Sequence, residues 1–193
     1  MTLYGLLLAG GKSSRMGRDK STLVYNGKTL GEHALALLGE CGVDKVLVSG
    51  SIPGYPGVRD LIPGCGPLGG IHAVLHYLDE QGLLDGSPLL VIPVDMPLLD
   101  IQTLDILVSA TGHADSCHFE GEVFPCVLKA SRRLKTALDD LFAESTELGG
   151  ARSMKALLRM GEELVLPVAG LPIDVFKNLN NPEDWERFRL GLE

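Results

Sequence analysis

The chain has 193 residues, of which 45% are hydrophobic and 22% are charged. These values fit a single globular domain over residues 1–193 and exclude a disordered or collagen-like chain. The net charge of −8 opposes general attraction to nucleic acid or to an anionic membrane, so an anionic ligand has to be held locally. The apolar stretches are too short to span a bilayer, and the four Cys show no C-x-x-C spacing. We therefore expect a cytoplasmic protein with reduced thiols.

Short apolar runs alternate with segments of helical periodicity along the chain, which predicts an α/β fold with a largely parallel sheet. The predicted strands are Tyr4–Ala9, Lys45–Ser49, Leu89–Pro93, Ala114–Phe119, Val123–Lys129 and Leu164–Leu166. The predicted helices are Thr29–Glu40, Leu68–Asp79, Ile101–Ala110, Ser131–Ala143, Ala151–Arg159 and Pro182–Leu190. Asn181 is placed to cap the last helix, with Pro182 at its first position.

The stretch from Gly50 to Gly70 is rich in Gly and Pro and is the longest segment without clear periodicity. Long irregular segments inside compact domains often carry function. A plain surface connection explains the same composition, so both interpretations stay open.

The predicted strand Tyr4–Ala9 leads directly into a glycine-rich basic segment, Gly10–Lys20. Ligands of parallel sheets collect at the carboxyl ends of strands, where backbone N–H groups of a Gly-rich turn can point at phosphate oxygens. The segment places four cations within nine residues of an acidic chain: Lys12, Arg15, Arg18 and Lys20. This concentration favours a local anion site over a basic surface loop.

Two common phosphate-binding patterns do not fit this segment. A Walker A loop requires G-x-x-x-x-G-K-[ST], but five residues separate Gly5 from the Gly11-Lys12-Ser13 triplet, and most of them belong to the strand. A dinucleotide-binding fingerprint requires G-x-G-x-x-G, an alternation that Gly10-Gly11-Lys12 does not supply. The segment therefore indicates a different kind of phosphate site.

The segment Leu8-Ala9-Gly10-Gly11-x-Ser13-x-Arg15-Met16-Gly17-x-Asp19-Lys20 resembles the N-terminal signature of nucleotidyltransferases, and in particular of molybdenum cofactor guanylyltransferases. The resemblance continues through most of the chain. Its other motifs are Gly66-Pro67-Leu68-Gly69-Gly70, Val94-Asp95-Met96-Pro97 and the segment from Phe176 to Asp184.

Asp95 follows the predicted strand Leu89–Pro93, so it should lie at the same sheet edge as the glycine-rich segment. A carboxylate there can hold Mg²⁺ together with phosphate oxygens, although Asp is also common at the start of a turn. Asn178 and Asn180 alternate with Leu179 and should point to one side of an extended segment. They either complete a metal, phosphate or acceptor site or serve turn and capping chemistry.

The resemblance implies a three-layer, Rossmann-like nucleotide-diphospho-sugar transferase fold with a mostly parallel central sheet. It implies transfer of GMP from GTP to the phosphate of molybdopterin, with Mg²⁺ as cofactor and with proteins that receive the cofactor as further partners. The catalytic residues that it implies are Arg15, Lys20 and Asp95, the last also as metal ligand. The nucleotide-binding residues are Leu8, Ala9, Gly10, Gly11, Ser13, Lys20, Asp60 and Asp95.

Two other functions remain to be separated from this one. A cytidylyltransferase would use CTP on the same acceptor, and a non-catalytic module would bind nucleotide or cofactor without turnover. The presence of both Lys20 and Asp95 speaks against the non-catalytic module, because pure binding does not need them in this placement.

His72 and His76 lie four residues apart on a predicted helix, a spacing that can chelate a metal ion. The sequence shows no H-E-x-x-H pattern and no evident third ligand. We therefore do not predict a zinc site. Cys117, His118 and Cys126 are likewise interpreted as buried side chains on adjacent strands.

Overall fold

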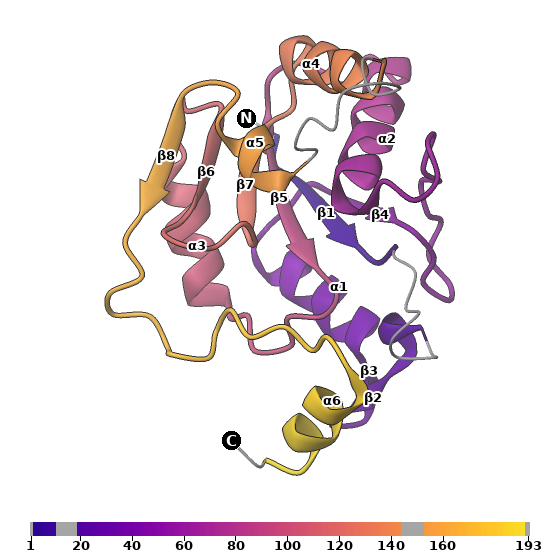
Figure 1. The fold of residues 1–193 in the computed structure, drawn as a ribbon, viewed down its shortest axis with the longest axis vertical. Coiled ribbons are helices and arrows are strands. Elements are labelled where there is room, and N and C mark those ends of the chain that lie inside the picture. Colours follow the sequence, from indigo (N-terminus) through magenta and orange to yellow (C-terminus); the bar gives the residue numbers. More distant parts are fainter. Residues whose placement is uncertain (1, 11–18, 144–152, 192–193) are drawn as a thin grey trace.

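A six-stranded sheet in the order β4-β1-β5-β7-β6-β8 forms the centre of the molecule (Figure 1). The computed structural model describes residues 2–10, 19–143 and 153–191. The strands of the sheet are β1 (Tyr4–Leu8), β4 (Lys45–Ser49), β5 (Pro88–Pro93), β6 (Ser116–Phe119), β7 (Cys126–Lys129) and β8 (Glu163–Leu166). Every residue of β1 is buried, as expected of a central strand covered on both faces.

Strand β1 is parallel to both of its neighbours, and the pairing brings three carboxyl ends together. Leu8 pairs with Ser49 of β4 on one side and with Pro93 of β5 on the other. Strand β7 is antiparallel to β5 and β6, whereas β6 and β8 are parallel. The prediction of a mostly parallel sheet is confirmed, with β7 as the reversed strand.

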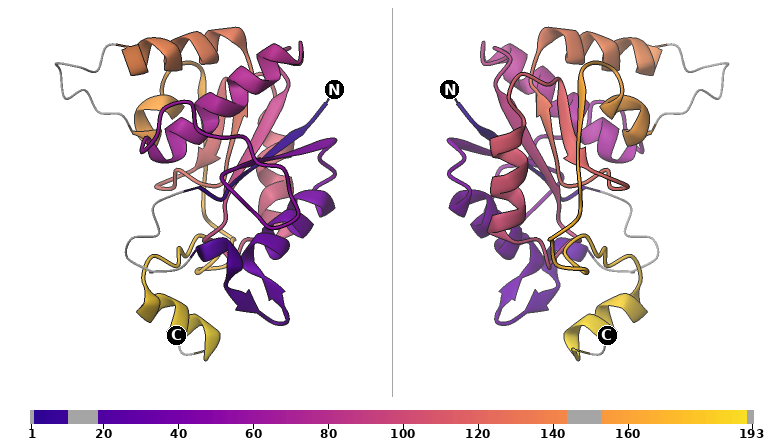
Figure 2. Two further views of the ribbon diagram at one scale, coloured as in Figure 1. Left: turned by 90° about the vertical axis from the view of Figure 1, so that its right-hand side faces the viewer. Right: turned by 90° about the vertical axis from the view of Figure 1, so that its left-hand side faces the viewer.

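Helices cover both faces of the sheet, which gives three layers (Figure 2). The helices α1 (Leu30–Glu40) and α3 (Ile101–Ala110) lie on one face. The helices α2 (Gly66–Glu80), α4 (Arg132–Ala143) and α5 (Met154–Leu158) lie on the other. This arrangement confirms the predicted three-layer α/β architecture. No helix in the described ranges has both the length and the apolar character that crossing a membrane requires.

Several predicted elements begin or end at different residues, for identifiable reasons. Helix α2 begins at Gly66 rather than Leu68, because Pro67 suits the first helical turn, where its missing N–H costs nothing. The ladder between β6 and β7 ends where His118 pairs with Cys126, so β7 does not extend back to Val123. Helix α5 begins after Ser153, whose side chain accepts a hydrogen bond from Ala156 N.

The sequence analysis missed a short hairpin and the single turn of 3-10 helix before it. The hairpin pairs β2 (Val24–Tyr25) with β3 (Lys28–Thr29), and the turn of helix is η1 (Lys20–Thr22). The hairpin turn, Asn26-Gly27, has positive φ at both residues, and Asn-Gly is a strong signal for such a turn. Strands of two residues are too short to show an alternating pattern.

The last helix, α6 (Pro182–Arg189), packs against this hairpin through aromatic rings. The ring centroids of Phe188 and Tyr25 lie 4.4 Å apart. The predicted cap is confirmed, because the Asn181 side chain accepts from Asp184 N while Asp184 accepts from Asn181 N. This cap fixes where the chain leaves the extended segment before α6.

Candidate active site

The carboxyl edge of the sheet carries the residues that follow β1, β4 and β5. Hydrogen bonds continue the pairing beyond the strands: Ala9 N donates to Ser49 O at 2.8 Å, and Val94 N donates to Leu8 O at 3.1 Å. The segments that carry Gly10 and Asp95 are therefore held side by side. This is the edge at which ligands of parallel sheets bind.

Lys20 and Asp95 form an ion pair at this edge, with 2.7 Å between Lys20 Nζ and Asp95 Oδ2. The side chains are 17% and 21% exposed, so both are largely withdrawn from water but still accessible. They lie 75 residues apart in the sequence. Lys20 and Asp95, which the sequence analysis named as catalytic residues, with Asp95 also as metal ligand, are thus in direct contact.

The position of Lys20 is fixed by the local structure of η1. The Asp19 carboxylate accepts hydrogen bonds from Ser21 N at 2.9 Å and from Ser21 Oγ at 2.8 Å, which caps this turn of helix. Ser21 is fully buried, so its side chain anchors the turn against the body of the protein. The Lys20 side chain is therefore presented from a fixed backbone rather than from a loose loop.

The extended segment before α6 is tied directly to Asp95. Leu179 N donates to Asp95 O at 2.9 Å, and the Leu179 side chain is buried. Asn178 and Asn180, on either side, are exposed and line the same cavity as Asp95. The predicted alternation is therefore present. Asn181 caps the helix, and Asn180 contributes its backbone N–H to that cap.

A cavity of about 280 Å³ surrounds the ion pair. Its lining includes Leu8, Ala9, Gly10, Asp19, Lys20, Asp95, Phe124, Asn178 and Asn180. Carboxylate and amide oxygens are ligands that hard divalent cations prefer, and an ammonium group suits phosphate oxygens. The donor set of this cavity thus fits a divalent cation bound together with phosphates.

A larger cavity of about 750 Å³ adjoins the first and shares Leu8, Gly10 and Pro67 with it. It is lined by the turn-rich stretch after β4, including Arg59 and Asp60. Ser49 Oγ donates to Asp60 Oδ1 at 3.4 Å. Partial burial raises the pKa of the Asp60 carboxyl, and the Ser49 hydrogen bond opposes this shift in part. The stretch from Gly50 to Gly70 is thus a cavity wall and not a plain connection.

Two glycines allow the backbone to come close at the junction of the cavities. Gly50 has φ near +103°, and a Cβ there would overlap the Gly10 backbone N. At Gly70, in the first turns of α2, a Cβ would overlap Ser49 Oγ. Any larger residue would therefore displace either the end of β1 or the hydroxyl that contacts Asp60.

The structure brings most of the predicted site residues together around the two joined cavities. These are Leu8, Ala9, Gly10, Lys20, Asp60, Asp95, Asn178 and Asn180. Gly11, Ser13 and Arg15 lie outside the described residues. The sequence analysis did not assign Arg59 or Phe124, which also line the cavities. Arg59 carried a usable signal, because it is a cation next to Asp60 in the turn-rich stretch.

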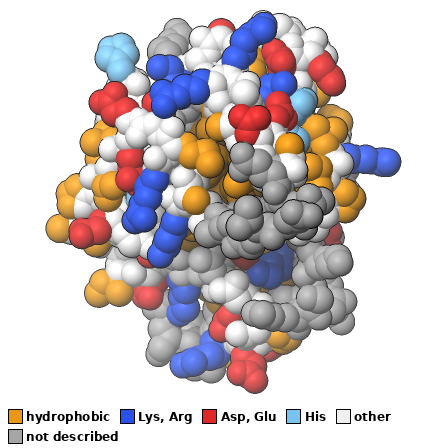
Figure 3. All heavy atoms as spheres, turned by 45° about the horizontal axis from the view of Figure 1, so that its top comes forward, with side chains coloured by type: hydrophobic (Ala, Val, Ile, Leu, Met, Phe, Trp, Pro, Cys, Tyr) orange, Lys and Arg blue, Asp and Glu red, His pale blue; other side chains and the backbone are white. Residues whose placement is uncertain are grey.

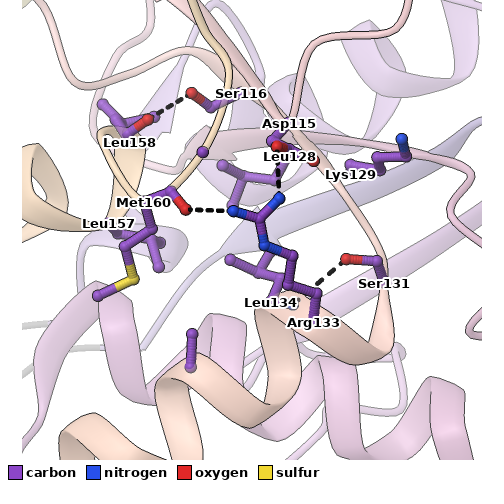
Figure 4. A pocket seen from close by; sticks show the side chains of 12 residues that line it. Asp115, Ser116, Leu128, Lys129, Ser131, Arg133, Leu134, Leu157, Leu158 and Met160 are labelled. Atoms are coloured by element: carbon purple, nitrogen blue, oxygen red, sulfur yellow. Dashed lines mark hydrogen bonds and ion pairs between the residues drawn. The ribbon is translucent and has the colours of Figure 1, made fainter.

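A third hollow, of about 40 Å³, lies at the opposite end of the sheet, between α4, α5 and strands β6 and β7 (Figure 4). Its lining is largely apolar, and its most prominent cation is already engaged. Arg133 donates to Asp115 Oδ2 at 3.2 Å and to Met160 O at 3.4 Å. This hollow is far smaller than the two cavities at the carboxyl edge and lies at the other end of the sheet, so it is not a candidate nucleotide site.

Comparison with known proteins places these features in one family. A family model described as the MobA-like NTP transferase domain matches residues 5–166. A protein of Xanthomonas euvesicatoria named molybdenum cofactor guanylyltransferase is 37% identical over 183 residues, covering 95% of this chain and 92% of its own.

Solved structures share the fold at lower identity. The molybdopterin-guanine dinucleotide biosynthesis protein A of Archaeoglobus fulgidus has a TM-score of 0.72 at 21% identity, covering 97% of each chain. Rv0371C of Mycobacterium tuberculosis, solved as a complex with manganese, has a TM-score of 0.65 at 17% identity, covering 98% of this chain and 99% of its own. These solved structures therefore have the same overall fold as this chain.

Proposed function

Since the chain belongs to the MobA-like NTP transferase family, we propose that it is a molybdenum cofactor guanylyltransferase, which transfers GMP from GTP to the phosphate of molybdopterin. The observation that carries this proposal is the contact between Lys20 and Asp95 at the carboxyl edge of the sheet, beside two joined cavities. The 37% identity to a protein of that name over nearly the whole chain supports GTP as the nucleotide substrate and molybdopterin as the acceptor.

The reaction needs positioning and charge neutralisation more than proton transfer. The acceptor is a phosphate monoester, which is already ionised near neutral pH. One of its oxygens attacks the α-phosphorus of GTP, a new P–O bond forms, and the bond to the β-phosphate breaks with release of pyrophosphate. The protein accelerates this step by aligning the two substrates and stabilising the negative charge that shifts to the leaving group.

Lys20 and Asp95 carry opposite charges and have different roles in this reaction. The Lys20 ammonium group is held on a fixed turn and stabilises negative charge at the α-phosphate. Asp95 would hold a divalent cation, and Asn178 and Asn180, which line the same cavity, could add amide oxygens as ligands. We propose Mg²⁺, which would supply Lewis-acid stabilisation of the phosphate oxygens. The manganese complex of a structural neighbour with the same fold supports a divalent ion.

The larger cavity is the proposed site of the guanine base. Guanine presents N1–H and N2–H₂ donors, and the Asp60 carboxylate is an acceptor in the cavity wall. Ser49, the last residue of β4, donates a hydrogen bond to one oxygen of the Asp60 carboxylate. The ionised form of Asp60 is the form that accepts both donors, so guanine binding and burial act in opposite directions on its pKa.

The resemblance adds three residues of the glycine-rich segment to the proposed site. Gly11 and Ser13 would contribute to the phosphate cradle, and Arg15 would neutralise the pyrophosphate.

The four free cysteines are in keeping with a proposed cytoplasmic location. We also propose that proteins which use the cofactor receive the product.

The decisive test is incubation of the purified protein with molybdopterin, Mg²⁺ and α-labelled GTP or CTP. We expect labelled dinucleotide and pyrophosphate from GTP. Exclusive transfer from CTP would instead identify a cytidylyltransferase. Tight nucleotide binding without product would identify a non-catalytic module.

A further inference from the structure

Two histidines of α2 and an aspartate of α4 converge on the face of the molecule where these helices pack. His72 Nε2 and His76 Nε2 each lie 2.7 Å from the same oxygen, Oδ1 of Asp139. The three ligand atoms lie within 4.8 Å of one another. Asp139 is thus the third ligand that the spacing of the two histidines lacked in the sequence.

The imidazole rings are held in place by their neighbours. The ring centroids of His72 and His76 are 4.6 Å apart in an edge-to-face arrangement, and Phe142 packs 4.9 Å from His72. The His72 side chain is only 6% exposed. The His72 Nε2 atom is therefore presented in a fixed direction, as a preorganised ligand requires, and His76 and Asp139 can adjust around it.

One atom of this cluster is not satisfied by the hydrogen bonds of the described residues. His72 Nδ1 is buried and has no hydrogen-bond partner among them. Unsatisfied buried atoms in a native protein point to a water that completes their hydrogen bonding. A metal ion at Nε2 would place the ring proton on Nδ1, where a water would have to accept it.

Charges around the cluster are balanced, and one of them competes with a cation. Lys135 Nζ lies 3.3 Å from Asp139 Oδ2 and 3.5 Å from Asp79 Oδ2, and Arg132 contacts Asp79 at 3.7 Å. Although burial would raise the pKa of Asp139, hydrogen bonds from His76, His72 and Lys135 together hold it below its usual range. Asp139 is therefore an anionic ligand at neutral pH, and Lys135 is the cation that contacts its second oxygen.

We propose that His72, His76 and Asp139 bind a divalent transition-metal ion of the Zn²⁺ class. Zn²⁺ binds imidazole nitrogen and carboxylate oxygen at about 2.0–2.2 Å, which places neighbouring ligand atoms roughly 3.3 Å apart in a tetrahedral site. The 2.7 Å contacts must lengthen by about 0.6 Å to reach that spacing. Side-chain rotations at the more exposed His76 and Asp139 can supply a shift of this size.

The cluster is open to solvent on one side. His76 and Asp139 are 28% and 37% exposed, and Figure 3 shows histidine, acidic and basic side chains beside one another on the face toward α4. Water can therefore supply a fourth ligand, and the ion has a path of entry. Two imidazoles favour Zn²⁺, Co²⁺ or Ni²⁺ over Mg²⁺, which prefers oxygen ligands.

The proposed site is separate from the candidate active site, although both involve α2. Pro67, in the first turn of α2, lines both active-site cavities. His72 lies five residues further along, or roughly 7–8 Å at the rise of an α-helix. A metal ion at His72, His76 and Asp139 would join α4 to α2 without contacting the phosphates. We expect it to affect stability and not the transfer reaction.

The test is Zn²⁺ and Co²⁺ binding to metal-free, tag-free protein that carries Asp95→Asn, which removes the proposed active-site ligand. We expect one equivalent of Zn²⁺ by calorimetry and a visible Co²⁺ absorption spectrum of the tetrahedral type. His76→Gln and Asp139→Asn should each weaken binding at least about tenfold. His113→Gln, at an exposed histidine outside the cluster, is the matched control and should bind as the parent does.

Lys135→Gln sharpens the test, because it removes the competing cation and leaves all three ligands in place. We expect it to tighten Zn²⁺ binding severalfold. Zn²⁺ should also raise the Tm of the parent but not of His76→Gln, a partly exposed position where the variant is expected to fold. Absence of stoichiometric Zn²⁺ binding, or binding that His76→Gln leaves unchanged, would overturn the proposal and leave a hydrogen-bonded contact between helices.

Discussion

Two regions of the molecule contain a short contact between a carboxylate and a basic side chain: the carboxyl edge of the sheet and the interface between α2 and α4. The two contacts arise from different kinds of structure. At the sheet edge, Lys20 and Asp95 follow strands whose ends the parallel pairing brings together. Between the helices, Asp139 meets His72 and His76 because α4 packs across α2. The first contact follows from sheet topology, whereas the second depends on how two helices pack.

Because of this difference, substitutions in the two regions are expected to affect different properties of the protein. Lys20 and Asp95 lie beside cavities large enough for a nucleotide, so their loss should affect turnover. The contact of Asp139 with the histidines lies between helices, away from these cavities, so its loss should affect stability. Each prediction below tests one side of this division.

The largest effect is expected for Asp95→Asn. The variant keeps the shape of the side chain but loses the charge that pairs with Lys20 and holds the cation. We expect kcat to fall by about 100- to 1000-fold, as for removal of one group that stabilises the transition state. Steady-state GMP transfer measures this effect. Asp105→Asn, at an exposed position on α3, is the matched control, and equal loss in both variants would remove Asp95 from the mechanism.

Asp60→Asn should act on nucleotide recognition and not on the chemical step. We expect the KM for GTP to rise about 10- to 100-fold with kcat nearly unchanged, because a partly buried, charged acceptor for the guanine donors is lost. Steady-state kinetics with GTP and CTP measure this. A parallel rise of both KM values would mean that Asp60 supports the cavity wall and not the base.

The pH dependence of GTP binding gives a second measure of Asp60. Burial raises the pKa of its carboxyl above the ordinary value of 3.8, and guanine binding requires the ionised form. The KM for GTP should therefore rise as pH falls through this raised pKa, at a higher pH than an ordinary Asp would produce. Asp60→Asn should flatten this rise. An unchanged profile in the variant would assign the titration to another group.

Gly70→Ala should disturb the junction of the two cavities, because its Cβ would overlap Ser49 Oγ. We expect a loss of about 1–3 kcal/mol in the free energy of unfolding and a higher KM for GTP. Urea denaturation and kinetics measure the two effects. Gly39→Ala is the control: it lies in α1 with open space around it, and it should stabilise the protein by up to about 1 kcal/mol.

The smallest effect is expected for Asp139→Asn. We expect a loss of about 1 kcal/mol in the free energy of unfolding at neutral pH, with GMP transfer unchanged, because the charged hydrogen bonds are partly exposed. The pKa of Asp139 is lowered by folding, so its contribution is present above the ordinary value of 3.8 and is lost as pH falls below it. Urea denaturation should show the variant and the parent converging in acid. A constant difference would assign the stabilisation to packing.

The sequence predicted the sheet edge well because its signals are local. A buried strand followed by Gly10, or by Asp95, specifies both the element and the end at which a ligand binds. The alternation of Asn178 and Asn180 around Leu179 likewise follows from the geometry of an extended chain. Each of these residues lies where its immediate neighbours indicated.

The remaining features depend on contacts between distant parts of the chain. Asp139 lies on a charged, amphipathic helix, where an acidic residue is typical of a solvated face and gives no sign of His72 across the interface. The Phe124 side chain reaches the cavity because β7 runs antiparallel to β5, a reversal that the apolar run did not indicate. The hairpin at Asn26-Gly27 was missed because its strands have only two residues each.

The most direct test of the account is a crystal structure of the protein with a non-hydrolysable GTP analogue and Mn²⁺, read by anomalous scattering. We predict a metal peak within about 2.2 Å of an Asp95 oxygen, with Lys20 on the phosphates and the guanine in the cavity beside Asp60. A nucleotide bound elsewhere, or a metal peak at the histidines of α2 with none at Asp95, would contradict it.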